Sequence, residues 1–266
     1  MLRILYLGDV VGRSGRIAVA AYLRRAFKDD VPDLVVANGE NASGGKGIDP
    51  ATAEELRDEG VDVITTGNHV WQHRSIEAYL NETSRVLRPA NYPPGSPGVG
   101  WTIVETKRAR AEVGVLNLIG RVFMGPADCP FRAADAAVEV MRRTTPCILV
   151  DMHGEATSEK AAMAEYLRGR VSAVVGSHTH VQTADERVLA EGTAFLTDAG
   201  MCGPADSILG VRSDRVVERF LKQRPNRFDV ASGPAMVQGV IVTVEPSLGR
   251  AVSIERVQER PAASAA

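Results

Sequence analysis

The sequence has few cysteines, no strong excess of charge and no long apolar run, and each absence excludes a class of protein. Its three cysteines, Cys129, Cys147 and Cys202, are widely spaced and odd in number. They form no zinc-type or redox pair, and they favour a reducing compartment. The net charge of −2 leaves no basic footprint for a long nucleic acid. No apolar run approaches the roughly 20 residues of a membrane span.

The first residues also leave no room for a secretory signal, because only Leu2 to Leu7 precede the polar pair Gly8-Asp9. We therefore expect a cytoplasmic, soluble protein with a small substrate and with neither a long nucleic acid nor a membrane as partner. A homo-oligomer is among the assemblies that this composition allows. The chain of 266 residues is long enough for one large domain. We predict a single domain over residues 1–258 and a frayed tail over 259–266.

Short apolar runs alternate with segments of helical periodicity along most of the chain, which is typical of an α/β protein. The last part changes character, because residues 237–244 and 251–257 are rich in β-formers with no helix between them. This predicts an antiparallel pair that closes a second sheet. The predicted strands are 3–7, 34–37, 61–66, 101–105, 113–119, 147–150, 171–175 and 193–196, and the predicted helices are 17–27, 50–59, 75–82, 134–143, 158–168 and 214–223.

The most informative stretch is Gly176-Ser177-His178-Thr179-His180, which follows the apolar run 171–175. In an extended chain His178 and His180 point the same way, whereas a helix would place them roughly 200° apart. Neutral imidazole is the commonest metal ligand, so the pair predicts a metal site at a strand exit. Two hydrogen-bonded surface histidines are the alternative for an isolated pair.

Polar side chains follow the other predicted strands as well. Since open α/β sheets bind ligands beyond the carboxyl ends of their strands, we expect these side chains to meet. Such a cluster is costly without a cation, and two metal ions would satisfy it. Glu40 is the better bridging ligand, because a carboxylate can serve two ions. The candidates are Asp9, Glu40, Asn41, Asn68, His69, His153, His178 and His180.

Each candidate also has a simpler structural role when it is taken alone. Asp9 or Asn68 can cap a helix, and Glu40 can be a solvated loop acid. His153 can be a hydrogen-bonded core histidine. These interpretations weaken together, because scattered structural residues have no reason to gather at strand exits.

These residues carry a resemblance to a known family. The segments 8–13, 38–41, 67–69 and 176–180 resemble the ordered motifs of calcineurin-type metallophosphoesterases. Longer segments resemble, more narrowly, the bacterial YmdB-like family. They are Thr65-Thr66-Gly67-Asn68-His69-Val70-Trp71, Arg88-Pro89-Ala90-Asn91-Tyr92-Pro93, Gly120-Arg121-Val122-Phe123-Met124, Glu155-Ala156-Thr157-Ser158-Glu159-Lys160 and the segment 178–187.

The resemblance implies a two-sheet β sandwich flanked by helices in four layers, and phosphodiesterase activity on 2',3'-cyclic nucleotides. It also implies two metal ions, with iron or manganese favoured and zinc as an alternative. By motif position, one ion would be held by Asp9, Asn41 and His180, and the other by Asn68, His153 and His178. Glu40 would lie between the ions, and His69 would be the proton donor.

Two positions depart from the broader superfamily pattern. Val11 replaces a histidine of the first motif, and Asn41 would supply the missing ligand. Val70 replaces the acid that usually orients the histidine equivalent to His69, and His73 or Asp151 are the possible substitutes.

The predicted chemistry is attack by a metal-activated hydroxide on a small phosphodiester, with His69 protonating the leaving alkoxide. Arg13 or Arg121 would add charge to the phosphate. The nucleobase of such a substrate would stack on one of four aromatic side chains that lie in the irregular loops or next to them in the sequence. The alternatives are a two-metal hydrolase of another bond type and a non-catalytic regulatory protein that contains metal. The four aromatic candidates are Tyr92, Trp101, Phe123 and Phe131.

Overall fold

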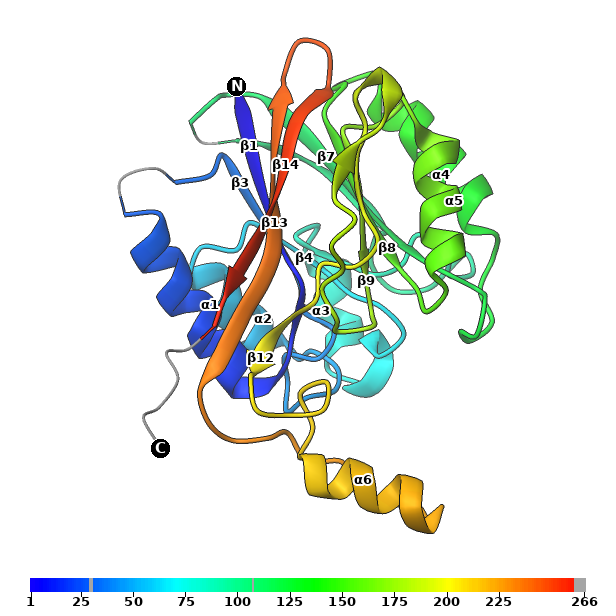
Figure 1. Cartoon of the computed structure of the whole chain (residues 1–266). Helices are drawn as coiled ribbons and strands as arrows, with labels where there is room; N and C mark the ends of the chain where they lie inside the picture. The colour runs from blue at the N-terminus through cyan, green and yellow to red at the C-terminus, as the bar shows by residue number, and fades with distance from the viewer. Residues whose placement is uncertain (29–30, 107, 261–266) are drawn as a thin grey trace.

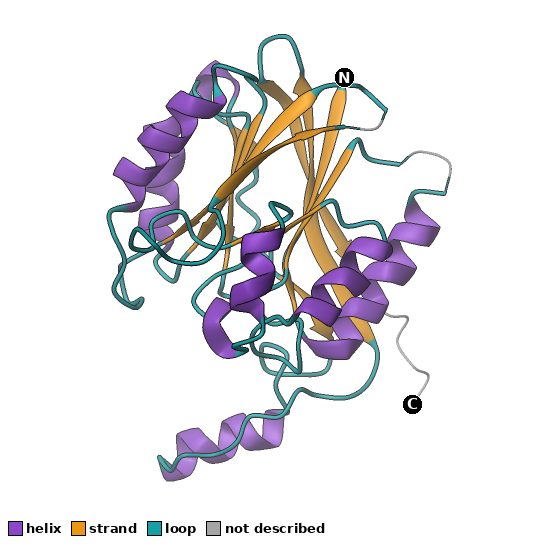
Figure 2. Cartoon of the chain, turned by 180° about the vertical axis from the view of Figure 1, so that it is seen from behind, coloured by secondary structure: helices purple, strands orange, loops and turns teal. Residues whose placement is uncertain are grey.

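The computed structural model describes residues 1–28, 31–106 and 108–260. Two β-sheets pack face to face, and helices cover the outer face of each (Figures 1 and 2). The predicted four-layer α/β sandwich is therefore confirmed. The first sheet runs in the order β2 (Asp9–Val10), β12 (Met201–Pro204), β13 (Ala235–Glu245), β1 (Leu2–Leu7), β3 (Leu34–Asn38), β4 (Val63–Thr65) and β5 (Val86–Leu87), with β14 (Arg250–Glu259) paired to β13.

The second sheet packs against the first through a shared core and is mostly parallel. Its order is β10 (Arg187–Val188), β11 (Ala194–Leu196), β9 (Ala173–Ser177), β8 (Ile148–His153), β7 (Glu112–Ile119) and β6 (Trp101–Glu105). The helices are α1 (Gly12–Ala26), α2 (Pro50–Asp58) and α3 (Ile76–Glu82) beside the first sheet, α4 (Pro130–Met141) and α5 (Thr157–Leu167) beside the second, and α6 (Ser213–Lys222), which projects from the body (Figure 1).

Strand β1 shows how the sequence produces these layers. Ile4 and Tyr6 belong to the core between the two sheets, whereas Leu5 and Leu7 belong to the core beneath α1 and α2. Successive side chains of a strand point to opposite faces, so a strand covered on both faces is apolar throughout. A third core joins the second sheet to α4 and α5. The continuous apolar runs therefore mark the strands that are buried on both faces.

The carboxyl ends of the parallel strands supply the polar residues of the molecule's centre. Strands β1, β3 and β4 are parallel in the first sheet, as are β7, β8 and β9 in the second. The two sets of ends meet, because Asn38 at the end of β3 lies 3.3 Å from Ser177 at the end of β9. The fold thus brings segments that are distant in the sequence to one place.

Two expectations about the C-terminal part differ from the structure. Strands β13 and β14 are antiparallel as predicted, but β13 pairs with β1 inside the first sheet and does not close a second one. The alternating pattern identifies a strand but not its partner. Strand β14 continues to Glu259, which forms an ion pair with Arg25. The rest of the predicted frayed tail, residues 261–266, lies outside the described residues.

Across the described ranges, no helix combines the length and apolar character that crossing a membrane requires.

Candidate metal centre

Polar side chains from both sheets converge where the parallel strands end. All eight residues that the sequence singled out lie here, and Asp9, Glu40 and His153 are completely buried. Direct contacts link them across the two sheets, such as the His178 backbone N–H that donates to Asp9 Oδ2 at 3.1 Å. The structure therefore brings eight residues, spread along the chain between positions 9 and 180, into one cluster.

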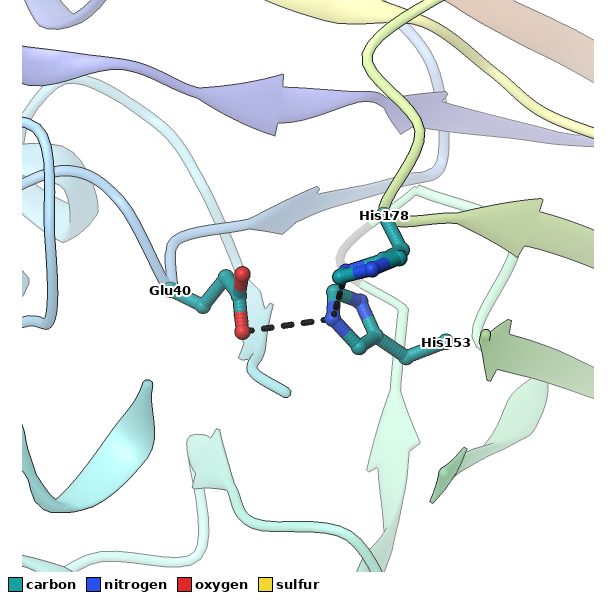
Figure 3. A group of neighbouring side chains, drawn as sticks. All are labelled: Glu40, His153 and His178. Carbon is teal, nitrogen blue, oxygen red and sulfur yellow. Dashed lines mark hydrogen bonds and ion pairs between the residues drawn. The ribbon is translucent and has the colours of Figure 1, made fainter. Parts of the chain in front are cut away.

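One group of atoms surrounds the ring nitrogen Nε2 of His153 (Figure 3). This nitrogen lies 3.1 Å from His178 Nδ1, 3.1 Å from Asn68 Oδ1 and 3.3 Å from Glu40 Oε2. The ligand atoms of Glu40, His153 and His178 all lie within 4.8 Å of one another, which is close enough for joint ligation of one ion.

Hydrogen bonds on the far side of His153 determine which of its nitrogens carries the proton. His153 Nδ1 lies 2.9 Å from Ser177 Oγ, and Ser177 Oγ donates its proton to Asp151 Oδ1 at 2.6 Å. A hydroxyl has one proton, so the serine accepts from His153 Nδ1–H. Burial lowers the pKa of His153 to about 4, which keeps the ring neutral. The nitrogen Nε2 therefore presents a lone pair to the group.

His178 is arranged in a similar way. Its Nε2 lies 3.3 Å from Glu155 Oε2, which favours the proton on Nε2 and a lone pair on Nδ1. The inward-facing atoms of His153, His178, Asn68 and Glu40 are then all acceptors, with no proton between them. Buried acceptors repel one another unless a cation lies among them. Histidine ligands whose other nitrogen donates to a nearby acceptor are characteristic of metal sites in proteins.

A second group forms around His180. Its Nδ1–H donates to the Leu209 carbonyl at 3.0 Å, so Nε2 is free to face Asp9 Oδ1 at 3.5 Å. That carboxylate oxygen is buried and has no hydrogen-bond partner among the described residues. Burial alone would raise the pKa of Asp9, but His180, His153 and the His178 N–H together lower it, and the same contact with Asp9 raises the pKa of His180 to about 9. Asp9 is therefore an ionised, buried acid, and a bound cation would satisfy it.

Glu40 lies between the two groups. Its Oε2 faces His153, and its Oε1 accepts from Asn41 Nδ2 at 3.1 Å. Asn41 Nδ2 in turn lies 3.1 Å from His180 Nε2. Burial is the largest influence on the pKa of Glu40 and would raise it, but His153 and His69 together lower it below its usual value. The carboxylate is thus charged and in contact with both groups.

His69 is oriented by residues other than the two that the sequence suggested. His69 Nδ1 lies 2.9 Å from Asn41 Oδ1 and 3.1 Å from Glu40 Oε1. By contrast, His73 Nε2 contacts the Lys46 carbonyl, and Asp151 is buried behind the centre against Ser177. The expectation for His73 and Asp151 is therefore wrong. The sequence identifies Asn41 and Glu40 as candidates for the site. Their contact with His69 is not visible in the sequence, because it depends on how the segment after β3 packs against the segment after β4.

The loop that carries His178 and His180 is not the extended exit that the spacing suggested. Both residues have positive φ angles, 102° and 64°, and their rings face different groups of the centre. The loop is held from behind by Asp198, whose Oδ2 accepts the Thr179 N–H at 3.1 Å and the Lys160 ammonium group at 2.7 Å. Positive φ angles at residues other than glycine are costly, so the surrounding contacts must stabilise this conformation.

A cavity of about 470 Å³ opens beside the centre. Its lining includes Lys46, which lies in a loop with positive φ at Gly44, Gly45 and Gly47. Neither arginine that the sequence proposed for the phosphate, Arg13 or Arg121, is among the lining residues. The described lining consists of Val11, Glu40, Asn41, Gly44, Gly45, Lys46, His69, Glu155, His178, Thr179, His180, Leu209, Val211, Phe228 and Val230.

The aromatic residue of this cavity is Phe228, which the sequence did not single out. Tyr92 packs against Trp71 with ring centroids 5.9 Å apart, and Phe131 packs against Tyr166 at 5.3 Å. Of the other two candidates, Trp101 packs against the core of the second sheet, and Phe123 is 88% exposed. None of the four predicted aromatic residues lines the described cavity. Phe228 follows α6 in an irregular segment, so no local pattern identified it.

Comparison with known proteins gives matches along almost the whole chain. A family model described as YmdB-like protein matches residues 5–257. The chain is 44% identical over 256 residues to a Bacillus subtilis (strain 168) protein named 2',3'-cyclic-nucleotide 2'-phosphodiesterase, with 96% of each covered. Every residue of the centre lies inside these matches.

Two crystal structures have a similar fold. A hypothetical protein from Thermus thermophilus superposes with a TM-score of 0.90 at 43% identity, covering 98% of this chain and 100% of that one. A structure described as a novel phosphatase, from Mycoplasma pneumoniae, gives a TM-score of 0.87 at 31% identity, covering 97% of this chain and 94% of that one.

The ion pair behind the histidine loop generates a prediction about stability. Lys160→Met removes the ammonium group from a pair that is almost completely buried, and it leaves the Asp198 carboxylate without its charge partner. We expect the free energy of unfolding to fall by about 3–5 kcal/mol, measured by urea denaturation.

The double variant Lys160→Met with Asp198→Asn should recover part of this loss. Arg143→Met, which breaks the exposed pair with Glu139, is the control and should cost about 0–1 kcal/mol. Equal losses for the two single variants would contradict a structural role for the buried pair.

Proposed function

This chain belongs to the YmdB-like protein family, and we propose that it is a dinuclear metal-dependent phosphodiesterase that hydrolyses 2',3'-cyclic nucleotides. The observation that carries the proposal is the group of ligand atoms of Glu40, His153 and His178, all within 4.8 Å of one another, beside a cavity that also contains His69 and Lys46. The relative from Bacillus subtilis supports the choice of substrate by its name. Residues 1–258 would act as one domain, because both sheets contribute to the centre.

The donor atoms of the centre fit two ions. Asp9, Asn41 and His180 would hold one, Asn68, His153 and His178 the other, and Glu40 would bridge them. Asn41 directs Nδ2 towards His180 and Oδ1 towards His69, so its oxygen would turn towards the ion on metal binding, while Glu40 Oε1 would keep its contact with His69. Carboxylate, amide and imidazole donors without a thiolate suit iron, manganese or zinc, and the family resemblance favours iron or manganese among these. Bound ions of this kind lower the pKa of water and polarise a phosphoryl oxygen.

His69 is placed to handle the proton of the leaving group. Its Nδ1 contacts Asn41 Oδ1 and Glu40 Oε1, both acceptors, so Nδ1 carries one proton and the general acid would be the imidazolium form, with a second proton on Nε2. Its side chain is partly exposed and lines the cavity, so a bound substrate can reach it. In this role His69 protonates the departing alkoxide as a general acid. Lys46 replaces Arg13 and Arg121 as the candidate cation for the phosphate, because it lines the cavity.

Cysteine chemistry supports the proposed cytoplasmic location. Cys129, Cys147 and Cys202 are all free thiols. Free thiols support a location in the reducing cytoplasm.

The function is tested by comparing substrates on protein loaded with manganese or iron. We expect 2',3'-cyclic AMP to be hydrolysed faster than 3',5'-cyclic AMP, because the five-membered cyclic diester is strained. Bis-p-nitrophenyl phosphate should also be cleaved, and a peptide substrate should not. A preference for the 3',5' isomer, for single-stranded RNA or for the peptide would overturn the assignment.

Glu40→Gln tests the bridging role. The amide keeps the shape of the side chain but loses the negative charge that allows two cations to lie close together. We expect the variant to fold normally, to bind fewer than two ions per chain and to lose most of its activity. Metal analysis after dialysis and the turnover of 2',3'-cyclic AMP are the measurements, with the exposed Glu139→Gln as control. Two retained ions with near-normal turnover would contradict a bridging carboxylate.

His69→Ala and His178→Ala should separate proton transfer from metal binding. His69→Ala is expected to keep its metal content and to lose about 10²–10⁴-fold in rate. The loss should be smaller for bis-p-nitrophenyl phosphate, because p-nitrophenolate leaves without a proton. His178→Ala is expected to lose metal instead. A drop in metal content for His69→Ala would show that His69 is a ligand and not the proton donor.

A further inference from the structure

The cavity beside the metal centre has two chemically different walls. One wall is polar and carries the centre itself together with His69, Lys46 and Glu155. The other is apolar and consists of Val11, Leu209, Val211, Phe228 and Val230. Ion binding and proton transfer explain the first wall but require nothing of the second. Binding sites for small molecules combine apolar walls with a few placed polar groups, so the second wall points to an apolar part of the ligand.

The apolar wall is held in place by its backbone. Val211 forms β-bridges with Ile208 and with Val230, and the Arg212 N–H donates to the Asp229 carbonyl at 3.0 Å. The segments before and after α6 are thereby joined. Val230 also packs against the glycine loop, since a Cβ atom at Gly45 would lie only 2.2 Å from its side chain. The wall and the loop that carries Lys46 therefore fix each other's position.

Leu209 connects this wall directly to the metal centre. Its backbone has a φ of 54°, a strained conformation for leucine, and its carbonyl accepts the Nδ1–H of His180. Its side chain lines the cavity and is 46% exposed. One residue thus orients a metal ligand with its backbone and offers an apolar surface with its side chain.

Phe228 is the planar group of the wall. Its side chain lines the cavity and is 46% exposed, which is unusual for a phenylalanine beside so many polar groups. The Arg219 guanidinium, from the projecting helix α6, lies 5.2 Å from the centre of the ring (Figures 1 and 2). This cation–π contact holds the ring while much of its surface stays accessible.

We propose that Phe228 is the stacking platform for the nucleobase of the substrate, with Leu209 and Val230 completing a nucleoside subsite. The proposal rests on the phosphodiesterase function proposed above and specifies where the base of that substrate lies. Every base has a flat π-face, so stacking on Phe228 selects for a nucleotide without selecting one particular base. The subsite therefore favours cyclic nucleotides as a class over cyclic phosphates that carry no base.

The test compares a substrate that has a base with one that has none. The measured quantity is the ratio of kcat/KM for 2',3'-cyclic AMP to kcat/KM for glycerol 1,2-cyclic phosphate, on metal-loaded protein. A base–aromatic stack contributes about 1–3 kcal/mol, so Phe228→Ala should lower this ratio about 5- to 150-fold. Phe228→Tyr should retain most of the ratio. Phe220→Ala is the matched control, because Phe220 is 79% exposed on α6 and does not belong to the described lining.

A binding measurement separates this proposal from the proposed function. In Phe228→Trp, adenosine, which has no phosphate, should quench the added tryptophan fluorescence in a saturable way. If wild-type protein cleaves both diesters but Phe228→Ala leaves the ratio unchanged, the subsite is wrong and the function stands. If wild-type protein cleaves neither diester, the function fails, and the adenosine titration alone decides the subsite. Absence of quenching in the folded Phe228→Trp protein would overturn the proposal.

Discussion

The structure depends on a cluster of hydrogen-bond acceptors that the fold brings together at its centre. His153 Nε2, His178 Nδ1, Asn68 Oδ1 and Glu40 Oε2 face one another, and Asp9 Oδ1 lies buried nearby, 3.5 Å from His180 Nε2 and without a hydrogen-bond partner among the described residues. Such an arrangement is unfavourable by itself, because Asp9, Glu40 and His153 are removed from water and two of them are acids. Folding energy from elsewhere must hold these atoms together until a cation occupies the space. The three apolar cores, which enclose both sheets, are the source of that energy.

The residues behind the ligands determine what the ligands can do. Ser177 and Asp151 fix the proton of His153 on the side away from the centre, and Leu209 does the same for His180. Lys160 and Asp198 hold the loop at Thr179, between His178 and His180. These partners come from the second sheet, from helix α5 and from the loops after β11 and β12, whereas Asp9, Glu40 and Asn68 lie in or after strands of the first sheet. The centre is therefore a property of the whole sandwich, and its geometry is only as rigid as the packing of the two sheets.

The sequence predicts which residues gather at the centre better than it predicts how they are arranged there. Strand ends are visible as apolar runs, and a polar residue after each run is a local signal, so all eight candidates could be named. Which residues touch each other is not local, and this explains the wrong expectation for His73 and Asp151. The positive φ angles of His178 and His180 occur in a loop that Asp198 holds through the Thr179 N–H. The residues next to these histidines in the sequence do not indicate that contact. Phe228 follows an exposed helix in an irregular segment, so only the folded chain shows that it belongs to the cavity.

The division of the cavity into two walls separates two properties that can change independently. The polar wall consists mainly of residues that follow strands, where a replacement would disturb the proposed metal centre. The apolar wall consists mainly of the segments on either side of α6. These segments line the cavity but do not belong to the three apolar cores described above. A change in those segments can alter the shape offered to the base and leave most of the metal ligands untouched. Leu209 is the exception, because its carbonyl holds His180. Variation in substrate preference at a constant metal centre should therefore be concentrated around Phe228 and Val230, with the backbone of Leu209 retained.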